Sequence, residues 1–499
     1  ELSDIKCRAL LLNIENGETL DEPAMAALQT AIDASEPDDI RIKYKRLYQA
    51  HIDEYFIDRS RDYSANDKRK EDDKTEAILE IYKNYGIDSV VSFGCSVDCS
   101  SDVGFKLGQK LGLDKLNETI RAAVSGKLTT EFLAFVLTGF ISDNGAEAVF
   151  NTELSQYPSD FISEVLSTIR LTGANLTIVG KLLKASEYLY WMKVSENCLV
   201  SFNGEYAMYA IDHLRNVRRS SAALRMCEIC IYRKENISSD LLLSLLEETL
   251  EQTDINDINE RLVRPVIKEL ESRRDEDIGD RLAAVEFSLL PLLEVYSDSR
   301  PDALYAAIGC NAELFCEFIE RGYKKRHQSE SDDAELPQGI RQRLGILSVN
   351  FRSAPGTDWS GNFNADVFNE WLSKVKTWAK ENDRYEVAMQ FAGQGISYAP
   401  KRDKVLMHET MIAALNDADA EEMRKGYILG VMNQRGAHFV DPTGTEERVI
   451  ADKYQKASDE ALAMGYLRYS HALRRIAEYY LREAQQTVKE EAERKQEEE

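Results

Sequence analysis

The sequence predicts an all-α protein: an irregular array of helical hairpins, an α-solenoid, followed by a compact helical C-terminal domain. Three observations support this prediction. Apolar residues recur along most of the 499-residue chain at the three- and four-residue spacing of amphipathic helices. Proline and glycine are scarce, at 10 and 26 residues, so helices are seldom interrupted. The chain is too long for one ordinary core, whereas each repeat of a solenoid packs only on its neighbours.

The clearest hairpin unit lies between Leu282 and Tyr323. Its first half has apolar residues at helical spacing and contains Pro291, which predicts a kink because proline removes a hydrogen-bond donor. Residues 299–302 break this helix, and a second apolar helix follows until Gly322. The pair cannot bury its apolar face alone, so stacking of neighbouring units is expected.

Residues 1–74 are predicted to form an N-terminal helical segment that ends in a mobile loop. Asp21 and Pro23 predict a helix start, because both residue types favour the first turn. A longer helix is expected over residues 40–57. The following residues, up to residue 74, carry almost no apolar side chains, which predicts the loop.

Residues 75–328 are predicted to form the helical-repeat array. Helices of roughly 10–15 residues alternate with turns of about two to six residues. Helix pairs recur at roughly 35–45 residues, as in tetratricopeptide-like and HEAT-like repeats, but the tetratricopeptide and ankyrin consensus patterns are absent. The expected helices span residues 75–85, 88–93, 101–111, 114–125, 129–141, 146–154, 159–170, 175–185, 206–217, 220–232, 239–252 and 255–270.

Residues 339–488 are predicted to form the compact C-terminal helical domain. The acidic, polar stretch 327–338 predicts a second mobile loop before it. Residues 489–499 are predicted to be a charged, frayed tail. One amphipathic helix of this domain carries the apolar residues Val367, Phe368, Trp371, Val375 and Trp378.

The charge balance excludes some function classes. Lys and Arg number 62 and Asp and Glu number 87, so the formal net charge is −25. Such a charge repels nucleic acid and anionic membranes over most of the surface. Two basic clusters, residues 215–219 and 324–327, lie at expected helix ends, where cations favour the helix dipole. No signal segment or membrane-spanning run is visible, which predicts a soluble, cytoplasmic protein. The chain begins at Glu1 rather than Met, which indicates a fragment or a processed chain and leaves room for an effector domain outside it.

Known catalytic and cofactor motifs are absent from the sequence. It has no phosphate-binding glycine loop, no zinc-protease motif and no hydrolase nucleophile elbow. Cys227 and Cys230 form a C-x-x-C pair, but they lie in a helical run and are expected to be core residues rather than zinc ligands. We therefore expect no cofactor and no metal. The absence of these motifs favours a non-catalytic role for this chain and leaves an enzyme with a site assembled by the fold as the alternative.

The most site-like residues lie on two loops of the C-terminal domain. Asn433, Arg435 and His438 bring an amide, a guanidinium and an imidazole together between two helices. Arg352 and Trp359 lie on the other irregular loop and are expected to join them in a partner- or ligand-binding pocket. The alternative is a plain helix end that Gly436 terminates.

Several short segments between Leu282 and Ala484 carry a family resemblance. They are residues 284–293 (AVEFSLLPLL), 300–301 (RP), 314–318 (LFCEF), 354–356 (APG), 368–371 (FNEW), 435–436 (RG) and 476–480 (IAEYY). This region, about two-fifths of the chain, resembles the C-terminal helical region of very large bacterial proteins associated with anti-phage defence. In those proteins an NTPase or nuclease-like effector precedes a helical sensor region. The resemblance implies a sensor or scaffold role and transfers no functional residue.

The function expected from these observations is protein recognition without catalysis. A curved solenoid offers a long binding surface, and an acidic one favours a basic or amphipathic partner. The resemblance implies that the partner is a phage protein or another subunit of a defence complex. Two alternatives remain: an enzyme or ligand-binding protein with a pocket on the C-terminal loops, and a structural subunit that holds an oligomer together.

Overall fold

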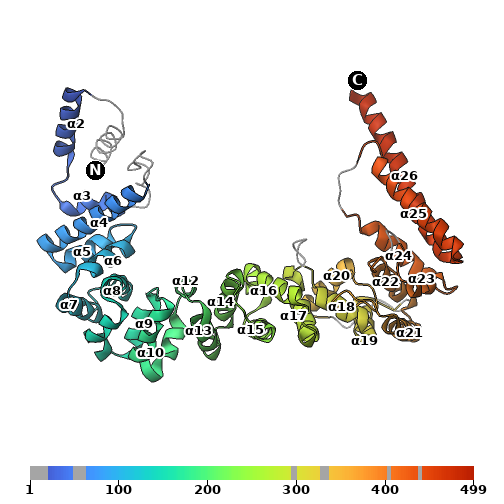
Figure 1. Ribbon diagram of the computed structural model, residues 1–499, viewed down its shortest axis with the longest axis horizontal. Coiled ribbons are helices and arrows are strands. Elements are labelled where there is room, and N and C mark those ends of the chain that lie inside the picture. The colour runs from blue at the N-terminus through green and yellow to red at the C-terminus, as the bar shows by residue number, and fades with distance from the viewer. Residues whose placement is uncertain are drawn as a thin grey trace. The chain divides into compact units, whose positions relative to one another are not determined.

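The computed structural model describes residues 21–48, 63–293, 300–325, 336–401, 406–436 and 441–498. Within these ranges the secondary structure consists of α-helices and short 3-10 helices (Figure 1). The same ranges contain one isolated antiparallel β-bridge, between Thr357 and Phe363. The all-α prediction is confirmed. No helix of the described part is long and apolar enough to cross a lipid bilayer.

Contacts between residues divide the chain into two compact units, residues 1–235 and residues 236–499. The boundary between the units falls inside the predicted array of residues 75–328. The limits predicted for the array and for the C-terminal domain are not tested by this division and stay predictions.

The first unit consists of helices joined by short turns, as expected for residues 75–235. Residues 146–156, predicted in part as a helix, form two 3-10 helices. The α-helices are α2 (Glu22–Ser35), α3 (Ile40–Lys45), α4 (Tyr63–Tyr85), α5 (Ile87–Cys95), α6 (Ser100–Lys110), α7 (Leu113–Val124), α8 (Thr130–Asn144), α9 (Ser159–Thr168), α10 (Thr177–Leu183), α11 (Tyr188–Lys193), α12 (Glu196–Leu199), α13 (Gly204–Asn216) and α14 (Ser220–Tyr232).

The predicted loop before residue 75 is wrong for residues 63–74, which form the first half of α4. Ion pairs with α6 stabilise this polar stretch. Lys74 Nζ lies 2.7 Å from Asp102 Oδ2, and Lys106 Nζ lies 2.7 Å from Glu71 Oε2. Both lysine side chains are largely buried. Pairing with a neighbouring helix therefore replaces apolar packing here, which composition alone does not reveal.

The second unit is also built from helices, with an irregular loop over residues 351–364. Residues 489–498, predicted as a frayed tail, instead continue α26, and ion pairs three and four residues apart support this helical end. Most of the predicted loop 327–338 lies outside the described residues. The helices are α15 (Ser239–Gln252), α16 (Glu260–Arg273), α17 (Gly279–Leu293), α18 (Asp302–Cys310), α19 (Ala312–Gly322), α20 (Gln338–Asn350), α21 (Ala365–Glu381), α22 (Tyr385–Ser397), α23 (Glu409–Asn416), α24 (Glu421–Asn433), α25 (Thr445–Ala463) and α26 (Leu467–Glu498).

Glycines allow two pairs of helices to approach at backbone distance. In the first unit, a Cβ on Gly108 of α6 would lie 1.9 Å from the carbonyl oxygen of Val136 in α8, and a Cβ on Gly139 would lie 2.0 Å from that of Phe105. The same relation holds in the second unit between α22 and α24. A Cβ on Gly393 would lie 1.9 Å from the carbonyl oxygen of Met423, and a Cβ on Gly426 would lie 1.9 Å from that of Gln390. In both pairs the contacting residue numbers rise together, so the paired helices run in the same direction.

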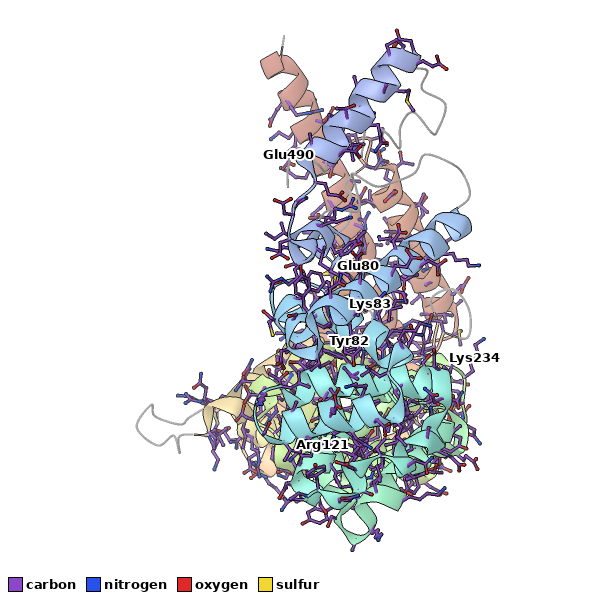
Figure 2. The ribbon with its side chains drawn as sticks, turned by 90° about the vertical axis from the view of Figure 1, so that its left-hand side faces the viewer. Glu80, Tyr82, Lys83, Arg121, Lys234 and Glu490 are labelled. Carbon is purple, nitrogen blue, oxygen red and sulfur yellow. The ribbon has the colours of Figure 1, made fainter. Side chains whose placement is uncertain are left out.

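Hydrogen bonds and ion pairs also join residues about 34 positions apart in both units. Figure 2 labels Glu80 on α4 and Arg121 on α7. Glu80 accepts a hydrogen bond from the hydroxyl of Tyr44, 36 residues earlier, and Arg121 pairs with Glu153, 32 residues later. Bonds between positions 34 residues apart are Gln109–Asp143, Thr130–Glu164, Arg281–Glu247 and Tyr385–Asp419.

Candidate functional site

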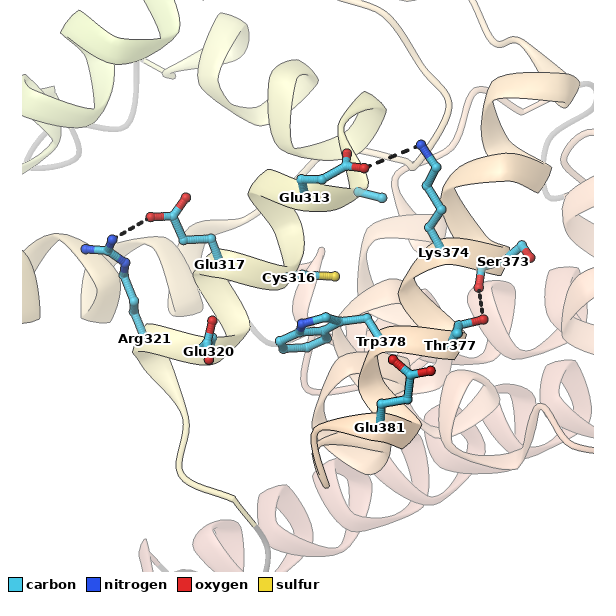
Figure 3. A pocket seen from close by; sticks show the side chains of 11 residues that line it. Glu313, Cys316, Glu317, Glu320, Arg321, Ser373, Lys374, Thr377, Trp378 and Glu381 are labelled. Atoms are coloured by element: carbon cyan, nitrogen blue, oxygen red, sulfur yellow. Dashed lines mark hydrogen bonds and ion pairs between the residues drawn. The ribbon is translucent and has the colours of Figure 1, made fainter. Parts of the chain in front are cut away.

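A groove lies between α19 and α21 in the second unit (Figure 3). Its volume is about 700 Å³. Asn311 caps α19 by accepting a hydrogen bond from the amide of Leu314, and Asn364 caps α21 by accepting bonds from the amides of Asp366 and Val367. These caps fix where each helix begins, and therefore which side chains point into the groove.

Aromatic packing below the groove holds the two helices together. The indole of Trp371 donates to the carbonyl oxygen of Ile308 at 3.2 Å, and its ring centre lies 4.8 Å from that of Phe315. At the far end, the buried guanidinium of Arg384 donates to the carbonyl oxygens of Glu320 and Asn382, beside the C-terminal ends of α19 and α21. A cation beside two helix C-termini is favourable, so Arg384 connects the ends of α19 and α21.

The groove has more carboxylates than cations. Glu313 lies 3.4 Å from Lys374, and Glu317 lies 2.7 Å from Arg321. A hydrogen bond from the Glu313 backbone amide, and then Lys374, lowers the pKa of Glu313. Glu320 and Glu381, both exposed, have no ion-pair partner among the described residues, so two negative charges of the groove are uncompensated.

Trp378 forms the aromatic part of the groove. Figure 3 shows its indole between α19 and α21, near Glu320 on one side and Glu381 on the other. The residue is half-buried. A half-exposed indole face flanked by carboxylates attracts a cation both through the ring and through charge. Cys316 also lines the groove, but burial raises the pKa of its thiol to about 12, so it is not a thiolate nucleophile at neutral pH.

A second, apolar groove lies between α17, α18, α19 and α20, with a volume of about 480 Å³. Glu317 and Arg321 line both grooves. The outward edge of α19 therefore separates an acidic, aromatic groove from an apolar one.

Buried carboxyl groups cap the neighbouring helix α18. Pro301 precedes α18 and provides no side-chain cap. Instead, Glu286 Oε2 accepts from the amide of Leu304 at 2.7 Å, and Glu271 Oε1 accepts from that of Asp302 at 3.4 Å. Glu286 is 0% exposed, and its Oε1 has no donor within the described part of the chain. These carboxyl groups replace the missing cap.

This pair titrates unusually. Burial, and then the neighbouring charge of Asp302, raises the pKa of Glu271 to about 7. Burial, and then Glu271, raises the pKa of Glu286 well above its ordinary value. Two ionised carboxylates have no proton to share, whereas one proton between them supplies the donor that Glu286 Oε1 lacks.

The predicted site residues that the structure describes lie on the loop after α20 and at the C-terminal end of α24. Arg274 donates from Nη1 to the carbonyl oxygen of Trp359 at 2.5 Å, while the Trp359 indole nitrogen is buried without a partner among the described residues. Arg352 is exposed on the loop after α20. Arg435 lies 2.7 Å from Glu447.

Asn433 is exposed at the end of α24, and His438 lies outside the described residues. No hydrogen bond or ion pair between described residues joins Arg352 or Trp359 to Asn433 or Arg435. The pocket predicted from these five residues stays a prediction.

The C-x-x-C cysteines are core residues, as predicted. Cys227 and Cys230 are buried in α14, and burial raises the pKa of each thiol to about 12. No group of three or more His, Cys, Asp or Glu side chains in the described part of the chain is placed to hold a metal ion.

Sequence reasoning missed the acidic groove. Glu313, Glu317 and Glu320 recur at helical spacing and form a visible acidic stripe on α19. The sequence spacing places Trp378 with the apolar residues of its helix, seven residues after Trp371. Trp371 is buried, but Trp378 is only half-buried and faces the groove. The acidic stripe on α19 is therefore visible in the sequence, whereas the sequence spacing of Trp378 does not indicate that it faces the groove.

The chain matches no protein-family model, no curated protein and no solved structure. These comparisons identify no family for the resemblance to defence proteins. The structure itself shows a helical protein over the ranges that it describes.

Proposed function

We propose that the chain is a non-catalytic protein-recognition scaffold whose groove between α19 and α21 binds a basic segment of a partner protein. The observation that carries the proposal is the pairing of Trp378 with the uncompensated carboxylates Glu320 and Glu381. A lysine or arginine side chain would stack on the indole and pair with a carboxylate. The net charge of −25 would steer such a partner toward the chain.

The proposal includes an irregular helical-repeat array over residues 75–328 and a helical domain over residues 339–488. Parallel contacts between α6 and α8, and between α22 and α24, support a repeating arrangement. So do the hydrogen bonds between residues 34 positions apart. Stacked hairpins bring equivalent positions of successive repeats together in this way.

The resemblance to anti-phage defence proteins refines the proposal. In that setting the chain is the sensor part of a cytoplasmic defence protein or complex, and its partner is a phage protein or another subunit. The acidic groove would accept either kind of partner, because in both cases it would bind a segment rich in lysine or arginine.

Affinity capture from the native host, with and without phage infection, tests this function. The wild-type chain is compared with Glu320→Lys/Glu381→Lys and with a control, Glu251→Lys/Glu460→Lys. The control residues are exposed on α15 and α25 and have no ion pair in the described part of the chain. Both double variants change the net charge equally, so a difference between them cannot come from total charge.

We expect one stoichiometric protein partner that the groove variant captures at least tenfold less well and the control captures normally. Loss of the partner in both double variants would show that total charge, and not the groove, determines binding. Recovery of a small molecule, or of this chain alone as an oligomer, would instead favour the ligand-binding or the oligomerisation alternative.

A further inference from the structure

We propose that the apolar groove between α17, α18, α19 and α20 binds the apolar face of an amphipathic helix in the same partner, and that the basic flank of that helix crosses α19 to the acidic groove. This inference rests on the proposed function and specifies the form of the partner. The two grooves then act as one composite site with α19 as its central edge.

The lining of the apolar groove suits a helix. Leu304, Ile308 and Leu344 are buried around it, and the small side chains of Ala283 and Ala307 leave room for a close approach. An amphipathic helix that binds such a groove inserts apolar residues spaced three or four positions apart. A volume of about 480 Å³ is within the usual range of ligand sites, so several apolar side chains can enter.

Leu314 marks the edge of this groove on α19. It is 41% exposed although it lies within an apolar lining. Covering exposed apolar surface is favourable in water. A docked helix would bury Leu314, which gives the groove a favourable contact that the free chain lacks.

Shared residues connect the two grooves. Glu317 and Arg321 line both of them and pair with each other on the exposed edge of α19. An exposed pair of this kind contributes little to stability. A partner cation can therefore replace Arg321 beside Glu317 at small cost. Glu320, which lines only the acidic groove of the two, lies beside Trp378 and would receive a second cation of the same partner.

Charge selects the occupant. Asp280 and Glu317 at the rim of the apolar groove, together with the carboxylates beyond α19, favour a cationic helix. A second copy of this chain carries a net charge of −25 and is repelled by that rim. We therefore assign the groove to a basic amphipathic helix of another protein rather than to self-association.

Fluorescence anisotropy with two labelled peptides tests the inference on the full chain. The first is a synthetic 18-residue helix of leucine and lysine, with leucine at positions i, i+3, i+4 and i+7. The second has the same composition in scrambled order, so that it has equal charge and no apolar face. We expect the amphipathic peptide to bind at least tenfold more tightly than the scrambled one.

Substitutions then locate the binding site. Ala284→Trp fills the groove from an exposed position on α17, and Leu314→Asn makes its edge polar. Each substitution should lower the affinity for the amphipathic peptide at least fivefold and leave the affinity for the scrambled peptide unchanged. Val349→Asn is the matched control, because Val349 is 75% exposed on α20 and does not line the groove. Circular dichroism checks that each variant is folded, and either groove variant alone is sufficient.

The possible results separate the two proposals. Equal affinities of the two peptides, or an unchanged affinity in Ala284→Trp and Leu314→Asn, would overturn the helix inference. If Glu320→Lys/Glu381→Lys still weakens both peptides in that case, the acidic groove and the proposed function stand. If no variant changes either affinity, both proposals fail. A change in oligomeric state with Ala284→Trp, measured by sedimentation velocity, would assign the groove to a second copy and overturn the inference.

Discussion

The two units bring parallel helices to backbone contact in the same way but secure that contact differently. In the first unit, the contact between α6 and α8 is surrounded by aromatic side chains: Gly104 faces the Cβ of Phe135, and Gly94 of α5 faces the ring of Phe132. In the second unit, polar groups surround the contact between α22 and α24. Ser397 Oγ faces Gly430, and Gln434 Nε2 donates to the carbonyl and the hydroxyl oxygen of Ser397 at 2.8 Å each.

This difference shows which part of the contact is essential. The missing Cβ is common to both units, whereas the surrounding chemistry is interchangeable. Aromatic packing stabilises α6 and α8 through buried area. The hydrogen bonds of Ser397 stabilise one alignment of α22 and α24, because a shift would leave buried polar groups without partners. Around the glycines, the first unit thus relies on shape and the second on directed bonds. The bond between Gln109 and Asp143, which also joins α6 to α8, is exposed to solvent.

The largest expected effect comes from the shared feature. Gly108→Ala and Gly393→Ala each place a Cβ 1.9 Å from a carbonyl oxygen. The neighbour is backbone and cannot rotate away, so each variant should lose about 3 kcal/mol of unfolding free energy, the upper part of the usual range for overpacking. Urea denaturation, followed by circular dichroism, measures the loss. Similar losses in the two variants would support a common design.

A glycine in open space provides the control for these variants. Gly345 lies within α20, and a Cβ there would meet nothing within 4 Å. Gly345→Ala should therefore stabilise the protein by about 1 kcal/mol through helix propensity alone. If Gly108→Ala or Gly393→Ala were also stabilising, backbone contact would not be the reason for glycine at those positions.

A smaller effect should distinguish the units. In the second unit, Gly430→Ala meets the hydroxyl of Ser397 at 2.5 Å, and Ser397→Ala removes that oxygen. The double variant should therefore be more stable than the sum of the two losses predicts, by about 1.5 kcal/mol. In the first unit, Gly104→Ala meets the Cβ of Phe135 at 2.7 Å, and Phe135→Ala retains that atom.

Two double-mutant cycles, measured by urea denaturation, make this comparison. We expect a clear coupling energy for Gly430 with Ser397 and a much smaller one for Gly104 with Phe135. Equal coupling in both cycles would mean that the units do not differ in the way proposed here.

Periodicity in the sequence was enough to predict the helices but not their partners. The apolar spacing of Phe368, Trp371 and Val375 predicted a buried face, and all three residues are buried in α21. The same spacing failed for Trp378, because exposure at the end of a helix depends on which other helix covers that turn. It also failed for residues 63–74, where ion pairs with α6 replace apolar contacts.

The candidate groove shows the same limit. The acidic stripe of α19 was present in the sequence, but α21 approaches it only through the packing of Trp371 on Phe315 and Ile308. The predicted loop residues Arg352 and Arg435 are charged and near helix ends, as many surface residues are. Which distant side chains meet is a property of tertiary packing, and local patterns carry little information about it.

The smallest predicted effect is a pH dependence specific to the second unit. In the folded chain the pKa of Glu271 is raised to about 7, by burial and then by Asp302, and that of buried Glu286 is also raised. An acid with a raised pKa binds a proton more tightly in the folded state. The resulting stability is fully present below the pKa of the unfolded chain and is lost as the pH rises through about 7.

We therefore expect the unfolding free energy to fall by about 1 kcal/mol between about pH 6 and pH 8 through this pair, by the standard conversion of pKa to free energy. Glu271→Gln should flatten this slope, because it removes the group that titrates near pH 7, and its amide oxygen can still accept from the amide of Asp302. Hydrogen exchange of peptides from α18, measured by mass spectrometry at both pH values, localises the effect. Parallel pH curves for the wild type and Glu271→Gln would show that the carboxyl groups that cap α18 do not titrate in this range, which would leave the polar contacts at Ser397 as the difference between the two units.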